Sequence, residues 1–113
     1  KKAVEYFQRE LGLLHLLVEV EEGEDEDARA YWTGNIEGQI YGLYYCTHWI
    51  NKPELSDESI IRVAFHEVYE ISFHEMKWRM RVEFDQEVVN GLIHEHVRRM
   101  ENVLLPYLMK KFN

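Results

Sequence analysis

The segment QIYGLYYCTHWI at residues 39–50 carries the clearest secondary-structure signal in the chain. Aromatic and β-branched residues dominate it, and its side chains alternate with the period of two that is typical of a strand. One alternating set contains Tyr41, Leu43, Tyr45, Thr47 and Trp49, and the other contains Ile40, Tyr44, Cys46, His48 and Ile50. We therefore predict a strand over residues 39–50, which the sequence NKP at 51–53 ends.

Two shorter strands are predicted before this one. Residues 14–20 alternate, with leucine and valine on one face, and residues 28–33 form a second candidate. The acidic run EEGEDED at 21–27 predicts a solvated turn, with a calcium or partner site as the alternative. A second turn is expected at 34–38. Three successive strands joined by short turns predict an antiparallel meander, in which strand tyrosines and tryptophans are interpreted as packing residues.

Helical patterns flank these strands on both sides. Residues 2–11 predict a short helix that Gly12 stops, and Ser56 is placed to cap a long helix that runs to about Trp78. Asp85 is placed to cap a last helix that runs to about Lys111, in which Pro106 should produce a kink or mark the fraying end. The predicted fold is a single α+β domain over 1–113, with an N-terminal helix, the meander and two long C-terminal helices packed on the sheet.

Composition and charge exclude several classes of function. The formal net charge of −8 argues against a nucleic-acid-binding surface. No apolar run approaches the roughly 18 residues of a membrane span, and the first residues do not resemble a signal peptide, so we expect a cytoplasmic protein without a membrane segment. Cys46 is the single cysteine, so the ligands of any metal must be His, Asp or Glu.

The stretch AFHEVYE at residues 64–70 contains a candidate metal site. His66 and Glu70 are four residues apart in a predicted helix, so their side chains can converge on one ion. Glu67 lies about 100° around the helix from His66, from where it could act as a general base on a metal-bound water. The pattern is that of an H-E-x-x-H helix with Glu70 in place of the second histidine. A helix-surface pair without a metal is the alternative interpretation.

The last helix offers the third ligand. A helical wheel places His94 in one narrow sector with Arg98 and Glu101, at the edge of the apolar face, and we therefore prefer His94. His74 and His96 are the alternatives. Two imidazoles and one carboxylate would leave a fourth position for water, as in catalytic zinc sites.

Residues 63–71, together with His94-Glu95 and residues 98–104, resemble a family of small phage and prophage proteins that are similar to minimal zincins, the SprT-like metalloproteases. The resemblance covers residues 55–105. It implies a zinc metallopeptidase that acts on a protein or peptide in the host cytoplasm. His66, Glu70 and His94 would bind zinc, and Glu67 would be either the catalytic acid or an acid that supports the ligands without binding the metal. Arg98 with Glu101-Asn102 would orient the ligands or join the helices. The alternative is a non-enzymatic, metal-stabilised phage protein that binds a host or viral protein.

Overall fold

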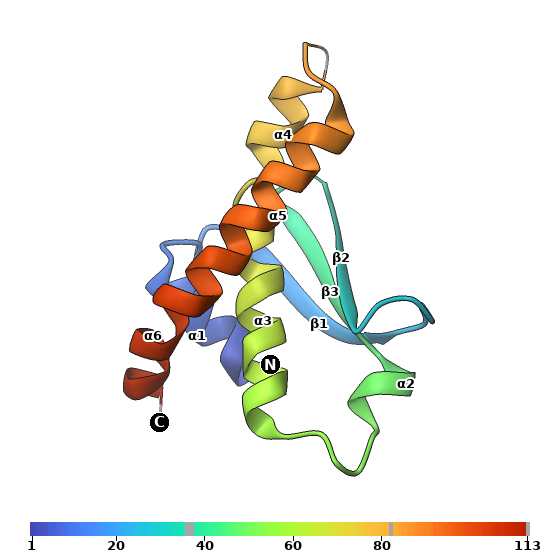
Figure 1. The fold of residues 1–113 in the computed structure, drawn as a ribbon, viewed down its shortest axis with the longest axis vertical. Helices are drawn as coiled ribbons and strands as arrows, with labels where there is room; N and C mark the ends of the chain where they lie inside the picture. Colours follow the sequence, from blue (N-terminus) through green and yellow to red (C-terminus); the bar gives the residue numbers. More distant parts are fainter. Residues whose placement is uncertain (36–37, 82, 113) are drawn as a thin grey trace.

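The computed structural model describes residues 1–35, 38–81 and 83–112, in which six helices and one three-stranded sheet form an α+β fold (Figure 1). The molecule measures 44 × 31 × 26 Å, and its long axis ends in an arm built from α4 and the start of α5. In chain order the elements are α1 (Lys2–Glu10), β1 (Leu17–Gly23), β2 (Ala30–Asn35), β3 (Ile40–Cys46), α2 (Thr47–Ile50), α3 (Asp57–Ile71), α4 (His74–Met80), α5 (Gln86–Val103) and α6 (Leu105–Phe112).

The sheet is mixed, so the predicted antiparallel meander is wrong. Its strand order is β1-β3-β2, with β1 parallel to β3 and β2 antiparallel to β3. Residues 24–29 connect β1 to β2 past the carboxyl end of β3, because Gly23 and Ala30 both pair near that end. The most apolar strand therefore occupies the centre, and the two flanking strands form the edges.

The strand limits also differ from the prediction. β1 begins at Leu17 rather than at residue 14, and it includes the first three residues of the acidic run that we predicted as a turn. β3 ends at Cys46, because the chain then turns into α2 and buries Trp49, whose ring stacks on Tyr45 with centroids 6.2 Å apart. Gly34 and Asn35, which we predicted in a turn at 34–38, instead form the end of β2, and residues 36 and 37 of that turn lie outside the described ranges.

Three predicted helix boundaries are confirmed by their capping geometry. After α1, Gly12 has a φ of +73°, and the N–H groups of Gly12 and Leu13 bond to the carbonyls of Arg9 and Gln8 in a Schellman motif. The Ser56 side chain accepts a hydrogen bond from the Ser59 N–H at the start of α3. The Asp85 side chain accepts one from the Glu87 N–H at the start of α5.

Both long helices are divided into two. The helix predicted to reach Trp78 breaks after Ile71, where the Ser72 hydroxyl donates to the Tyr69 carbonyl and competes with the regular helical bonding. The break in the last helix falls at Leu104, two residues before Pro106, whose missing N–H interrupts the helical ladder as predicted.

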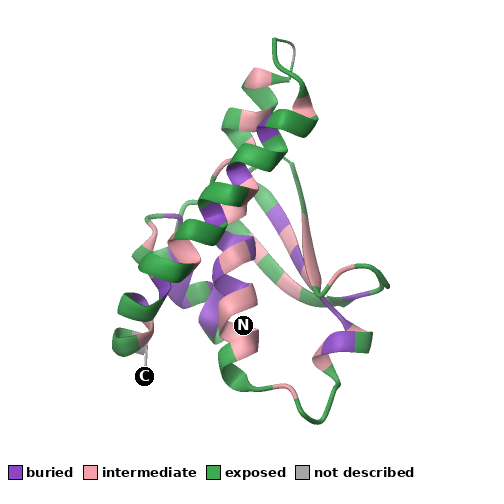
Figure 2. Ribbon diagram, viewed as in Figure 1, coloured by how far each residue is buried: buried purple, intermediate pink, exposed green. Residues whose placement is uncertain are grey.

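One main core joins α1, α3 and the inner face of β3. Figure 2 shows buried residues along α1, on one side of α3 and at alternating positions of β3, whereas the arm is mostly exposed. α5 packs on α3 rather than on the sheet, which corrects the prediction that both C-terminal helices cover the sheet. Among the described residues, no helix combines the length and the apolar character that crossing a membrane requires.

Candidate metal site

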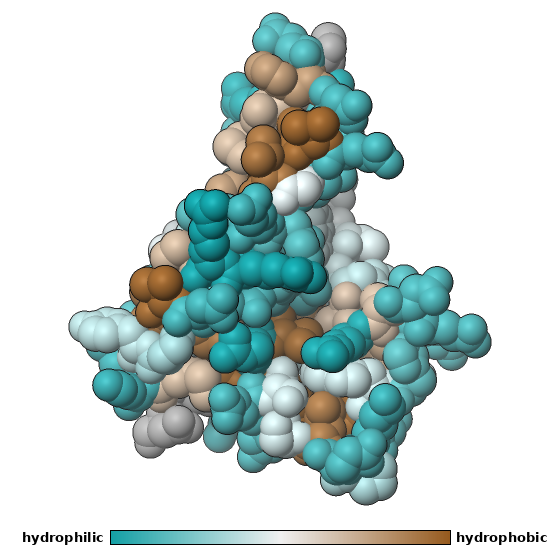
Figure 3. Space-filling view, in the orientation of Figure 1, coloured by the Kyte–Doolittle hydropathy of each residue, from teal (hydrophilic) through white to brown (hydrophobic). Residues whose placement is uncertain are grey.

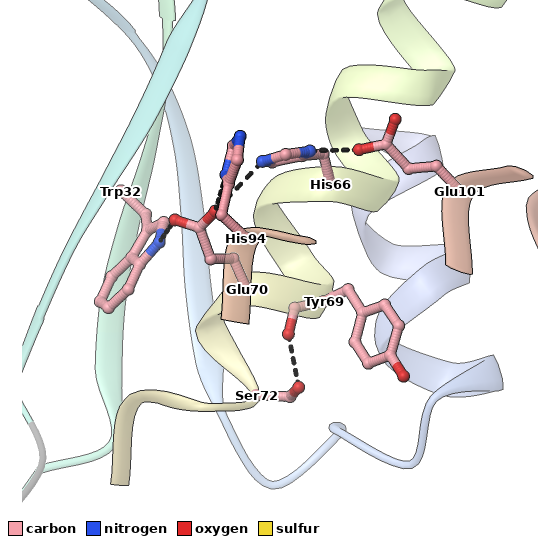
Figure 4. Close-up of polar contacts among 7 residues, drawn as sticks. All are labelled: Trp32, His66, Tyr69, Glu70, Ser72, His94 and Glu101. Carbon is pink, nitrogen blue, oxygen red and sulfur yellow. Dashed lines mark hydrogen bonds and ion pairs between the residues drawn. The ribbon is translucent and has the colours of Figure 1, made fainter. Parts of the chain in front are cut away.

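Three side chains with ligand chemistry meet where α3 and α5 pack together (Figure 4). His66 and Glu70 project from successive turns of α3, with His66 Nε2 3.1 Å from Glu70 Oε2. His94 faces them from α5, and its Nδ1 lies 3.6 Å from the same carboxylate oxygen. One ligand atom from each residue lies within 4.8 Å of the other two, so this cluster could hold a metal ion. No other such cluster occurs among the described residues.

Glu101 of α5 holds His66 from the side opposite Glu70. His66 Nδ1 bonds to Glu101 Oε1, and Glu101 Oε2 lies 3.7 Å from a guanidinium nitrogen of Arg62. An imidazole that donates its Nδ1–H to a carboxylate keeps the Nε2 lone pair for a metal, and this contact fixes its orientation. Glu101 is therefore placed to orient the His66 ring.

The two carboxylates beside His66 favour its protonated form. Burial disfavours the imidazolium, but hydrogen bonds to Glu70 and Glu101 outweigh burial and raise the pKa of His66 to about 9. Burial also works against the charged form of Glu70, yet hydrogen bonds from His66 and Trp32 lower the pKa of that carboxyl below its usual value. A bound cation would replace the proton on His66 Nε2, because coordination needs the lone pair that this proton occupies.

Trp32 of β2 contributes a contact that the sequence analysis missed. Its indole Nε1 donates to Glu70 Oε1 at 3.0 Å, which leaves Oε2 to face the two histidines. We had interpreted strand tryptophans as packing residues, and the alternation of a strand does not reveal that an indole N–H has a distant acceptor. The contact spans 38 positions, so no local pattern reports it.

Glu67 lies beside the cluster on the next position of α3. The residue is only 9% exposed, and it lines the same cleft as His66 and His94. Burial and the charge of Glu70 raise the pKa of Glu67 to about 8, although His66 acts in the opposite direction. A carboxyl group with a pKa near neutrality can both accept and release a proton at physiological pH.

Tyr45 of β3 is a core residue on which the charge of Glu67 acts. Its hydroxyl is buried and has no hydrogen-bond partner in the described part of the chain. Burial and the charge of Glu67 raise the pKa of Tyr45 to about 12. The hydroxyl therefore stays neutral, and it adds no charge to a site that already contains several carboxylates.

Three other histidines form hydrogen bonds outside the ligand cluster. His74 Nδ1 is 2.8 Å from the Tyr41 hydroxyl, and His96 Nε2 is 3.0 Å from the Tyr69 hydroxyl. His48, which we expected in a strand, lies in α2 with its Nε2 2.9 Å from the backbone carbonyls of Asp25 and Ala28. The cluster therefore forms with His94 and without either of its two alternatives.

Comparison with known proteins adds no relative: no family model matches the chain, and neither does a curated protein or a solved structure.

Proposed function

We propose that this protein is a zinc-dependent metallopeptidase in which His66, Glu70 and His94 bind the ion. The observation that carries the proposal is the buried carboxyl of Glu67, which lines the cleft directly beside a three-residue ligand cluster. A structural metal site needs ligands only. A hydrolytic site also needs a base that reaches the cleft and does not itself bind the metal.

The ligand cluster suits zinc in its chemistry, and two of its three separations are close to those of a tetrahedral zinc site. Ligands about 2.0–2.2 Å from a tetrahedral zinc are roughly 3.4 Å from one another. The separations of 3.1 Å and 3.6 Å to Glu70 Oε2 lie on either side of this value. Two imidazoles and one carboxylate also form a ligand set used by catalytic zinc sites, which keep a fourth position open.

The chain's own residues would then divide the work of hydrolysis. Zinc supplies a Lewis acid that acidifies water and polarises a carbonyl. Glu67 accepts the proton of the attacking water and passes it to the leaving amine. Glu101 keeps the His66 ring in place through its Nδ1, and Trp32 keeps Glu70 turned with one oxygen toward the site.

The position of strand β2 favours a peptide as the substrate. It is an edge strand, since the sheet order leaves its outer side unpaired. Ala30 and Trp32 of β2 line a cleft together with His66, Glu67 and His94. An extended peptide added to this edge would be held by backbone hydrogen bonds beside the cleft that the ligand cluster lines.

The test combines metal analysis with one substitution. Elemental analysis and anomalous scattering at the zinc edge should find one zinc per chain on the three ligands. Glu67→Gln should keep the zinc and lose peptidase activity by at least a hundredfold. Full activity of that variant on a peptide cleaved by the wild type would rule out Glu67 as the base, and a chain purified without zinc that gains no stability from it would rule out the site.

The alternative is a metal-stabilised protein that binds a protein partner, and the exposed apolar surface of the arm favours it. Trp78 is 48% exposed and Leu92 is 63% exposed. A fourth protein ligand on the metal, together with no hydrolysis of any peptide, would favour this alternative over the peptidase.

A further inference from the structure

Arginine side chains surround the cleft at one end of the ligand cluster. A cavity of about 490 Å³ borders His66 and His94, and Arg29, Arg62 and Arg98 are among the residues that line it. Figure 3 shows strongly hydrophilic surface over the middle of the molecule, between brown patches on the arm and near α6. Three guanidinium groups thus lie beside the ligand cluster, although the chain as a whole has a net charge of −8.

The helices position two of these arginines by the same geometry that positions the histidines. Arg62 precedes His66 by four residues on α3, and Arg98 follows His94 by four residues on α5. The two helices run in opposite directions, so both arginines lie at the same end of the cluster (Figure 1). Each lies about one helical turn, roughly 5.4 Å along the axis, from its histidine.

Asp27, Glu67 and Glu101 line the same cavity, but only one of the three arginines forms an ion pair in the described part of the chain. Arg62 is 3.7 Å from Glu101, a carboxylate that His66 already engages. Within the described ranges, neither Arg29 nor Arg98 forms an ion pair. The next residue along α5 provides the contrast, because Arg99 pairs with Glu95 at 2.8 Å on the outer surface of the helix.

We propose that this end of the cleft binds a carboxylate of the substrate, with Arg98 as the main contact and with Arg29 and Arg62 beside it. The guanidinium fork binds a carboxylate through two parallel hydrogen bonds. On a peptide held at the ligand cluster, the carboxylate is either the free C-terminus or an acidic side chain next to the scissile bond. The inference rests on the proposed peptidase function and names its substrate class.

Binding tests the inference without requiring hydrolysis. The zinc-loaded protein is titrated calorimetrically with N-acetyl-alanyl-alanine and with its amide, and then with N-acetyl-glutamate amide and N-acetyl-glutamine amide. At least one carboxylate probe should bind roughly tenfold more tightly than its neutral counterpart. The first pair reports a terminal carboxylate, and the second pair reports an acidic side chain.

Substitutions separate the arginines from the metal, which can itself attract a carboxylate. Arg98→Ala should remove the tenfold preference, whereas Arg99→Ala, the same change one position along α5, should keep it. Both residues are exposed on α5, so neither change removes a core contact. Equal binding of the acid and neutral probes, or a preference that survives in Arg98→Ala, would overturn the inference.

Hydrolysis then distinguishes the inference from the function on which it rests. Peptides with free and amidated C-termini, with and without glutamate, are digested by the zinc-loaded wild type and by Arg98→Ala. Cleavage without any carboxylate preference would overturn the inference and leave the peptidase proposal intact. If no peptide is cleaved but binding to the carboxylate probes still depends on Arg98, the peptidase proposal fails and the carboxylate site stands.

Discussion

The buried carboxyl of Glu67 makes the stability of the metal-free protein depend on pH in a predictable direction. Burial and Glu70 raise its folded-state pKa from 4.5 to about 8, so the folded state binds the proton more tightly than the unfolded chain does. Stability from this group is fully present below pH 4.5 and is lost as the pH rises toward 8. His66 acts in the same direction between pH 6.5 and about 9, because its folded-state pKa is also raised.

Glu67→Gln should remove the contribution of Glu67 and leave that of His66. Moving a pKa from 4.5 to about 8 corresponds to at most about 5 kcal/mol, at 1.36 kcal/mol for each tenfold change in proton affinity. Proton sharing within the cluster and local relaxation reduce this limit, so we expect the variant to gain about 1–3 kcal/mol over the wild type between pH 5 and pH 8. A residue that is required for hydrolysis would thus reduce the stability of the metal-free fold.

Urea unfolding followed by circular dichroism, in chelator and at intervals from pH 5 to pH 9, measures the difference. Glu95→Gln serves as the control, since the Glu95 side chain is 60% exposed on the outer side of α5. The reasoning is refuted if the gain from Glu67→Gln does not grow with pH, or if Glu95→Gln shows an equal gain.

Three further predictions concern the same site. Zinc binding should release about one proton per ion at pH 7 and strengthen toward pH 9, because His66 loses its proton to the metal; calorimetric heats that do not depend on the buffer would contradict this. Trp32→Phe should weaken zinc binding roughly tenfold by freeing Glu70, whereas Trp78→Phe, a change on the exposed arm, should leave the zinc dissociation constant unchanged. Tyr45→Phe should raise the free energy of unfolding by about 1 kcal/mol, because its buried hydroxyl has no partner in the described structure; a loss of stability in urea would contradict this.

Local chemistry made much of the fold predictable. The caps at Ser56 and Asp85 and the stop at Gly12 depend on residues within a few positions of each other, and the structure contains all three. The central strand was also recognisable, although its end was not. Trp49 continues the alternation of the strand, but in the structure it lies in the short helix α2, from which its ring packs against Tyr45.

The order of the strands was not predictable from the turns alone. The acidic run suggested a hairpin tip, and a hairpin would make β1 and β2 neighbours. The chain instead places β3 between them, because β3 buries Tyr41, Leu43 and Tyr45 and is the strand best suited to the centre. β1 carries glutamates at 19, 21 and 22, a feature of edge strands that could have indicated this order.

The candidate site was likewise predictable where local helical patterns determine it, and not where a distant contact does. His66 and Glu70 follow from helical spacing, and His94 follows from the edge of an apolar helix face. Trp32 did not follow, because an indole in a strand is usually a packing residue and its acceptor lies on another element. The role we assigned to Glu67 stays a prediction, but its burial beside the cluster shows why a carboxylate there has unusual chemistry.

The break after Ile71 connects these two outcomes. In an unbroken helix, His74 would lie one turn beyond Glu70 on the face that carries the ligands, which is why it was an alternative ligand. Because the chain turns at Ser72, the His74 ring packs against Trp32 with centroids 5.0 Å apart, and its Nδ1 reaches the Tyr41 hydroxyl. His74 therefore supports the indole that holds Glu70. The break that excluded His74 as an alternative ligand thus also supports Glu70, through contacts that run from the central strand to the ligand cluster.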